Sequence, residues 1–220
     1  MTAKTAVEEL ELIDTGEPPP PTRRGDFGWG GGEGSRRAQG RSPETYVTGI
    51  WVALASILMF FLALTSSFIV RKGLGQDWQP FELPRPLWLT TALLLVSSGT
   101  LERARRALAA GKRAVFSQWW TITTMLGVSF LAGQLVSWRL LWSAGVFLAT
   151  NPSSSFFYLL TGTHGLHLLG GLIALSYVGA RSRSATPWPA ECPAVTATAI
   201  YWHFLGVLWV FLFLLLLLGR

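Results

Sequence analysis

Five long apolar stretches constrain this chain more than any other feature of its sequence. The hydrocarbon core of a membrane is about 30 Å thick, and an α-helix rising 1.5 Å per residue crosses it with about 20 apolar residues. Backbone amides and carbonyls find no water there, so a spanning segment must be a helix. The expected spans are residues 49–70, 87–108, 119–139, 155–179 and 194–219. The sequence therefore predicts an all-α integral membrane bundle of five transmembrane helices.

The composition agrees with a membrane protein. Half of the 220 residues are hydrophobic and 14% are charged, against roughly a quarter charged in a soluble domain. Several of the 11 tryptophans lie near the ends of the apolar stretches, where their amphipathic rings suit the headgroup level. These are Trp51, Trp78, Trp88, Trp119, Trp120, Trp138 and Trp142. The arginines are spread over short loops and form no single basic stripe, so no nucleic-acid partner is expected.

The second expected span is the least apolar of the five. Pro86 suits its first helical turn, and its apolar part ends at Leu101. A polar continuation follows, which we expect to project into the membrane interface. It contains Glu102, Arg103, Arg105 and Arg106.

The distribution of basic residues predicts the orientation of the bundle. If the loops alternate between the two sides, ten lysines and arginines near the spans lie on the side of the N-terminus and five on the opposite side. Cytoplasmic loops carry the excess of such residues. We therefore expect the N-terminus in the cytoplasm and the C-terminus in the periplasm.

The chain is expected to have two parts. Residues 1–43 are rich in proline and glycine, with too little apolar surface to fold alone. They are predicted to be a disordered cytoplasmic tail, followed by the five-helix transmembrane domain at 44–220.

Three histidines are the main candidates for chemistry, because an ionisable group inside a membrane is costly and marks a functional site by default. His164 and His167 are three residues apart, a spacing that puts both on one helical face, and His203 lies in the last span. His164 and His203 each lie about 14 Å from a span end. Three imidazoles can bind zinc or copper. The spans lack the carboxylates or thiols that normally support metal-bound histidines. The favoured interpretation is bonding between helices, or contact with lipid phosphate or a partner subunit, with no metal ligand and no catalytic residue in this chain.

Two other polar residues stand out in the spans. Glu102 can serve as a proton-relay carboxylate, but three nearby arginines favour a surface ion pair. Gln134, deep in the third span, is expected to bridge helices. A histidine relay in a small transporter is an alternative function, although the internal repeats and interrupted helices common in transporters are not apparent.

Two motifs resemble those of one known family. Residues 154–158 and 161–167 are similar to the penultimate-helix signature of cytochrome c oxidase subunit III, and residues 201–204 with Trp209 resemble its last-helix signature. Weaker similarity at 49–61, 93–100 and 127–134 extends the resemblance over nearly everything after residue 45. This adds Trp202 and Trp209 to the lipid or subunit-interface candidates His164, His167, His203, Gln134 and Glu102.

The resemblance implies the short, five-helix form of the family. It implies a non-catalytic subunit III of a proton-pumping heme-copper oxidase in the bacterial inner membrane, sustaining proton uptake into the catalytic subunit and protecting that subunit during turnover. The expected partners are subunits I and II, phospholipids and a larger respiratory assembly. Heme and copper would be in the partner subunits and none in this chain, while bound phospholipid is expected beside the bundle in a lipid-filled cleft. The related accessory subunit of nitric oxide reductases is the second interpretation.

Three positions depart from the family pattern. Carboxylates usual in the family are replaced by Ile57 in the first span, by a residue near Ser137 in the third and by Gly206 in the last. A role that rests on the first-span glutamate therefore does not transfer to this chain. We expect the first span to face lipid or a partner through a purely apolar surface, without a buried polar cluster around Ile57.

Overall fold

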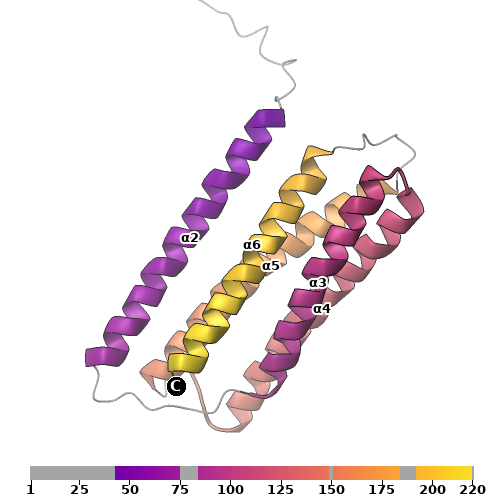
Figure 1. Ribbon diagram of the computed structural model, residues 1–220. Helices are drawn as coiled ribbons and strands as arrows, with labels where there is room; N and C mark the ends of the chain where they lie inside the picture. The colour runs from indigo at the N-terminus through magenta and orange to yellow at the C-terminus, as the bar shows by residue number, and fades with distance from the viewer. Residues whose placement is uncertain (1–42, 75–83, 149–150, 184–191, 220) are drawn as a thin grey trace, which may run out of the picture. The chain divides into compact units, whose positions relative to one another are not determined.

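The computed structural model describes residues 43–74, 84–148, 151–183 and 192–219, and these residues are entirely helical apart from short connections (Figure 1). The predicted tail lies outside the described residues except for Pro43, where the first helix begins. Trp78 also lies outside the described residues. So do four of the basic residues counted for the orientation, Arg36, Arg37, Arg41 and Arg220.

The described residues form five helices at the positions of the five expected spans. They are α2 (Pro43–Leu74), α3 (Pro86–Ala109), α4 (Arg113–Ser143), α5 (Pro152–Ser182) and α6 (Pro193–Gly219). Each extends beyond its apolar stretch or matches it, because a helix continues into the interface where water satisfies its last backbone groups. By length and composition α2, α4, α5 and α6 can each cross a membrane. The all-helical prediction is confirmed, and membrane-spanning character is confirmed for these four helices.

Local sequence signals account for most of the helix ends. Proline is the first residue of α2, α3, α5 and α6, where its fixed φ suits a helix and its missing N–H costs nothing. Gly111 and Gly145 follow α3 and α4 with φ of 72° and 77°. Both close Schellman motifs, in which the next residue bonds back to the final turn, as in Lys112 N–H to Ala107 C=O at 2.9 Å.

The helices pack as an antiparallel hairpin extended by three more helices. The turn between α3 and α4 is short, and these two helices lie side by side along their lengths (Figure 1). Helix α4 also packs on α5, while α6 packs on α5, on α3 and on α2. Helix α2 contacts α5 and α6. The central position of α6 explains why its tryptophans become part of the interior.

Glycines leave room for large side chains of neighbouring helices. A Cβ on Gly127 of α4 would lie 2.6 Å from the ring of Trp202 on α6, and one on Gly171 of α5 would lie 3.2 Å from the same ring. A Cβ on Gly162, Gly165 or Gly170 of α5 would make only ordinary contacts with larger side chains. Small residues at helix interfaces are typical of membrane proteins, because packing replaces the hydrophobic effect there.

Candidate functional site

An aromatic cluster lies where α4, α5 and α6 meet. The ring of His164 on α5 is fully buried, with its centroid 4.9 Å from Trp209 on α6 and 6.0 Å from Phe130 on α4. Trp209 and Phe130 meet edge to face at 5.0 Å. Neither ring nitrogen of His164 has a hydrogen-bond partner among the described residues. His164 is therefore held by ring packing.

Two tryptophans of α6 are bound to hydroxyl groups of α3. The indole N–H of Trp209 donates to Thr91 Oγ1 at 3.0 Å, and that of Trp202 donates to Ser97 Oγ at 3.0 Å. Both indoles are buried. Each hydroxyl in turn donates to a carbonyl of its own helix. This hydroxyl–indole ladder, formed by Thr91, Ser97, Trp202 and Trp209, fastens α3 to α6 and satisfies polar groups that would be costly in an apolar interior.

His203 continues the contacts between α3 and α6. Its Nδ1 is hydrogen-bonded to the hydroxyl of Ser98, one residue after the Ser97 that accepts from Trp202. One turn further along α3, Glu102 is bonded to Arg105 and Arg106 at 3.2 Å each. The surface ion pair predicted for Glu102 is confirmed.

His167 has surroundings different from those of His164. Its Nδ1–H donates to the carbonyl of Thr163 at 2.7 Å, and its ring lies 5.6 Å from that of Phe61 on α2. Its own carbonyl accepts from the hydroxyl of Tyr201 at 3.0 Å. The spacing of three brings the two histidines to the same side of α5. His164 nevertheless packs with α4 and α6, whereas His167 packs with α2. Within the described ranges, no three His, Cys, Asp or Glu side chains group as a metal site would require.

Gln134 joins α4 to α3, as predicted. Its Nε2 lies 3.4 Å from Thr90 Oγ1, and its buried Oε1 has no partner in the described part of the chain. The side chain is 3% exposed. A long donor contact and an unpaired acceptor make this a weak interhelical hydrogen bond.

Ile57, which stands where the family usually has a glutamate, has apolar surroundings. Ile57 is half-buried and packs against the core. Thr65, about 12 Å further along the axis, is the one buried polar side chain that the structure describes on α2. Ser56 and Ser67 on the exposed face bond to carbonyls of their own helix. Among the described residues no buried polar cluster surrounds Ile57, as expected. The outer surface of α2 is not purely apolar, however, because Ser56, Ser66 and Ser67 are exposed.

Sequence reasoning missed the acceptors of the hydroxyl–indole ladder. Trp202 and Trp209 are seven residues apart, a spacing that repeats one face of a helix, so the sequence does indicate a tryptophan face on the last span. Their acceptors Thr91 and Ser97 are six residues apart and show no such repeat, so spacing does not identify them. The choice among several hydroxyl-bearing spans required the structure.

The unpaired imidazole of His164 gives a prediction about stability. A buried polar group without a partner costs free energy, and an apolar residue of similar size in its place is nearly neutral or stabilising. We expect His164→Leu to leave the thermal midpoint of the assembled protein unchanged or to raise it. His203→Leu, which loses a bond to Ser98, should lower the midpoint. Equal decreases of the thermal midpoint in the two variants would show that His164 has a partner that the described residues do not provide.

The fold and the contacts in its interior define the class of protein. The chain is a multi-pass membrane protein of the helical type, with apolar side chains outside and its buried polar side chains between helices.

Comparison with known proteins identifies the family. The family model of cytochrome c oxidase subunit III matches residues 44–218, and the chain belongs to this family. It is 34% identical over 175 residues to the probable cytochrome c oxidase subunit 3 of Mycobacterium bovis, covering 78% of this chain and 86% of that protein. The corresponding protein of Nocardia farcinica is 35% identical over 177 residues, again covering 78% and 86%. Cytochrome c oxidase subunit 3 of Thermostichus vulcanus is 33% identical over 179 residues, covering 79% and 87%. The chain is thus a subunit III of a heme-copper oxidase and part of an oxidase complex.

Proposed function

We propose that this chain is a non-catalytic subunit that sustains proton uptake by the catalytic subunit and stabilises it during turnover. The hydroxyl–indole ladder is the observation that carries the proposal. In it two buried indoles of α6 are bonded to hydroxyl groups of α3, which holds the two helices together. A bundle built in this way supplies a fixed surface and fixed electrostatics beside a partner. Subunits I and II would be the partners, and heme and copper would be bound there.

Helix α3 is proposed as a fifth span. Its 24 residues measure about 36 Å, longer than a hydrocarbon core of about 30 Å. It lies along α4, which can cross a membrane, and a short turn joins the two. Its polar character comes partly from the four charged residues that follow Leu101 and partly from hydroxyl groups that have partners, such as Thr100, whose Oγ1 lies 2.8 Å from that of Thr123 on α4. Partnered hydroxyls inside a bundle are tolerated at membrane depth.

Five spans place the two termini on opposite sides of the membrane, with the N-terminus in the cytoplasm according to the count of basic residues. The membrane would be the bacterial inner membrane. Fusions of a reporter that is active only in the periplasm should give a signal at the C-terminus and none at the N-terminus. Signals from both ends on the same side would contradict the fifth span.

Co-purification tests the assignment to an oxidase. The chain, tagged at its N-terminus in its native host and extracted in mild detergent, is expected to bring with it a large heme-containing subunit and oxygen consumption. Recovery of the chain with a nitric oxide reductase would support the second interpretation, an accessory subunit of that enzyme. A colourless preparation without partners would contradict both.

Removal of the subunit tests the supporting role. We expect the oxidase depleted of this chain to take up protons more slowly and to lose activity progressively during sustained turnover, while the intact complex retains it. Adding back the purified chain should restore both properties. Equal uptake and equal loss of activity with and without the chain would overturn the proposal.

A further inference from the structure

Two buried polar side chains in the middle of the bundle carry atoms without hydrogen-bond partners. They are His164 on α5, which is 0% exposed, and Gln134 on α4, which is 3% exposed. Both ring nitrogens of His164 and the Oε1 of Gln134 are unpaired among the described residues. Along the helix axes, His164 lies about 5 Å and Gln134 about 9 Å from the midpoints of their helices. Both therefore lie inside a hydrocarbon core of about 30 Å, away from bulk water.

Contacts on either side place these two side chains at one depth. On one side, Phe130 of α4 packs against His164, with ring centroids 6.0 Å apart. On the other side, the indole N–H of Trp138 on α4 donates to Thr161 Oγ1 on α5 at 3.2 Å. Gln134 lies one turn from both Phe130 and Trp138. His164 lies one turn from Thr161 in the same direction, because α4 and α5 are antiparallel. Gln134 and His164 are therefore at the same level of the interior.

The same two side chains are also connected through α3 and α6. The Nε2 of Gln134 lies 3.4 Å from Thr90 Oγ1 on α3. The next residue, Thr91, accepts the indole N–H of Trp209 at 3.0 Å. The ring of Trp209 in turn lies 4.9 Å from that of His164. Together with the contacts between α4 and α5, these contacts form a closed loop through four helices, so Gln134 and His164 belong to one enclosed region.

The unpaired atoms have donors and acceptors that a single water molecule complements. A neutral imidazole has one donor and one acceptor nitrogen, whereas the amide Oε1 of Gln134 only accepts. The two groups do not bond each other directly. A water molecule can donate one hydrogen to the amide oxygen and also accept from the imidazole N–H or donate to its bare nitrogen. Buried water typically makes about three hydrogen bonds, and Thr90 Oγ1 beside Gln134 offers the third partner.

We propose that Gln134 and His164 bind one buried water molecule, which bridges α4 and α5 in the middle of the membrane. Unpaired polar groups are costly in an apolar interior, and water bound at such groups is part of the structure. A metal ion does not suit the site, because an imidazole, an amide and a hydroxyl carry no charge to compensate a buried cation. The site depends on packing within this chain and is independent of the proposed role in proton uptake.

The bridge is expected to add little net stability. The entropy lost when a water molecule is immobilised offsets much of the gain from its hydrogen bonds. A substitution of His164 by leucine removes the water together with the imidazole. The bridge therefore agrees with the small effect on the thermal midpoint expected for this variant, and the test of the site is a readout other than stability.

Radiolytic labelling of the intact complex tests the site. The complex recovered with the tagged chain is exposed to a short X-ray pulse, which converts water into hydroxyl radicals that oxidise adjacent side chains. Mass spectrometry then quantifies the oxidised residues. We expect oxidation of His164 and Trp209 although both are fully buried. Trp120 is the matched control, because it is 2% exposed and its indole N–H is bonded to the carbonyl of Leu175, so it should stay unlabelled.

A substitution of Gln134 separates the bridge from other sources of oxidation. Gln134→Met approximately keeps the volume of the side chain and removes the amide oxygen, so oxidation of His164 and Trp209 should be lost. Ser129→Ala removes a hydroxyl on the exposed face of α4 and should leave their oxidation unchanged. Oxidation of Trp209 no greater than that of Trp120 would overturn the proposal. So would oxidation that persists in Gln134→Met, because the water would then not be held by Gln134.

A density map of the unmodified complex supplies a test without a variant. At a resolution that shows ordered water, we expect a peak within about 3.2 Å of both Gln134 Oε1 and a ring nitrogen of His164. A map with ordered water elsewhere in the bundle and none between these two side chains would overturn the proposal. A direct hydrogen bond between Gln134 and His164 in the complex would do the same.

Discussion

Replacing Gly127 by alanine is expected to lower the unfolding midpoint of the protein substantially. The added Cβ would lie 2.6 Å from one ring carbon of Trp202 and 2.8 Å from a methyl group of Leu172. Trp202 is fully buried and bonded to Ser97, so its ring has little room to move. Overpacking of this kind costs about 1–3 kcal/mol, a fall of about 2–12 °C for a chain of this size.

Gly206→Ala is the matched control for this substitution. Gly206 is also buried in the middle of a spanning helix, but a Cβ there meets no atom within 4 Å. Because alanine is the better helix former by about 1 kcal/mol, this variant should equal or exceed the parent protein in stability. The comparison is made by heating the purified complex and measuring the chain that remains monodisperse on size exclusion. A Gly127→Ala variant as stable as Gly206→Ala would show that the ring of Trp202 does not lie against Gly127 as described.

Trp209→Ala is expected to have the largest effect of any single substitution in the interior. The ring is fully buried, packs on Phe130 and His164, and donates a hydrogen bond to Thr91. Removing a buried aromatic side chain costs about 3–5 kcal/mol, mainly through the cavity it leaves. We expect little folded chain to be recovered with the complex, as measured by the amount that co-purifies with its partners.

Two further substitutions separate packing from hydrogen bonding at this position. Trp209→Phe keeps an aromatic ring and loses the N–H, and an interhelical hydrogen bond in a membrane is worth about 0.6 kcal/mol on average. The stability lost in Trp209→Phe should therefore be much smaller than the stability lost in Trp209→Ala. Trp142→Ala removes an indole that is 58% exposed and should be nearly neutral. Similar losses in Trp142→Ala and Trp209→Ala would contradict a packed interior around Trp209.

The candidate site was only partly predictable from the sequence. The bridging role of Gln134 and the ion pair of Glu102 followed from their depth and from near neighbours in the chain. The spacing of His164 and His167 correctly indicated one side of α5, but it did not indicate that one ring packs with α4 and α6 and the other with α2. Those partners are on other helices, and their positions depend on how the helices cross.

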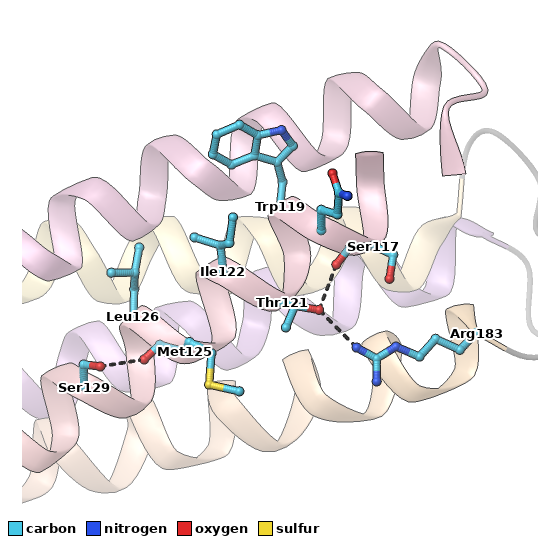
Figure 2. A pocket seen from close by; sticks show the side chains of 9 residues that line it. Ser117, Trp119, Thr121, Ile122, Met125, Leu126, Ser129 and Arg183 are labelled. Atoms are coloured by element: carbon cyan, nitrogen blue, oxygen red, sulfur yellow. Dashed lines mark hydrogen bonds between the residues drawn. The ribbon is translucent and has the colours of Figure 1, made fainter. Parts of the chain in front are cut away.

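A groove lined by a stripe of α4 between Ser117 and Ser129 and by Arg183 of α5 is a second feature that only packing created (Figure 2). Thr121 and Arg183 are separated by 62 residues, and neither attracts attention alone. They meet because the start of α4 lies beside the end of α5. The turn chemistry of the chain makes neighbouring helices antiparallel, but the rotation of each helix about its axis sets which stripe of α4 faces outward.

The sequence by itself determined the helices, their approximate ends and the membrane as their surroundings. Long apolar stretches, prolines at the first helical positions and glycines after the last ones act locally along the chain, so they can be read without a structure. The tertiary structure decided which face of each helix is inside. Lipid is as apolar as a protein core, so the hydrophobic pattern of a spanning helix shows little contrast between its two faces. Shape, as in the fit of Trp202 against Gly127, and hydrogen bonding, as in its bond to Ser97, make that choice instead.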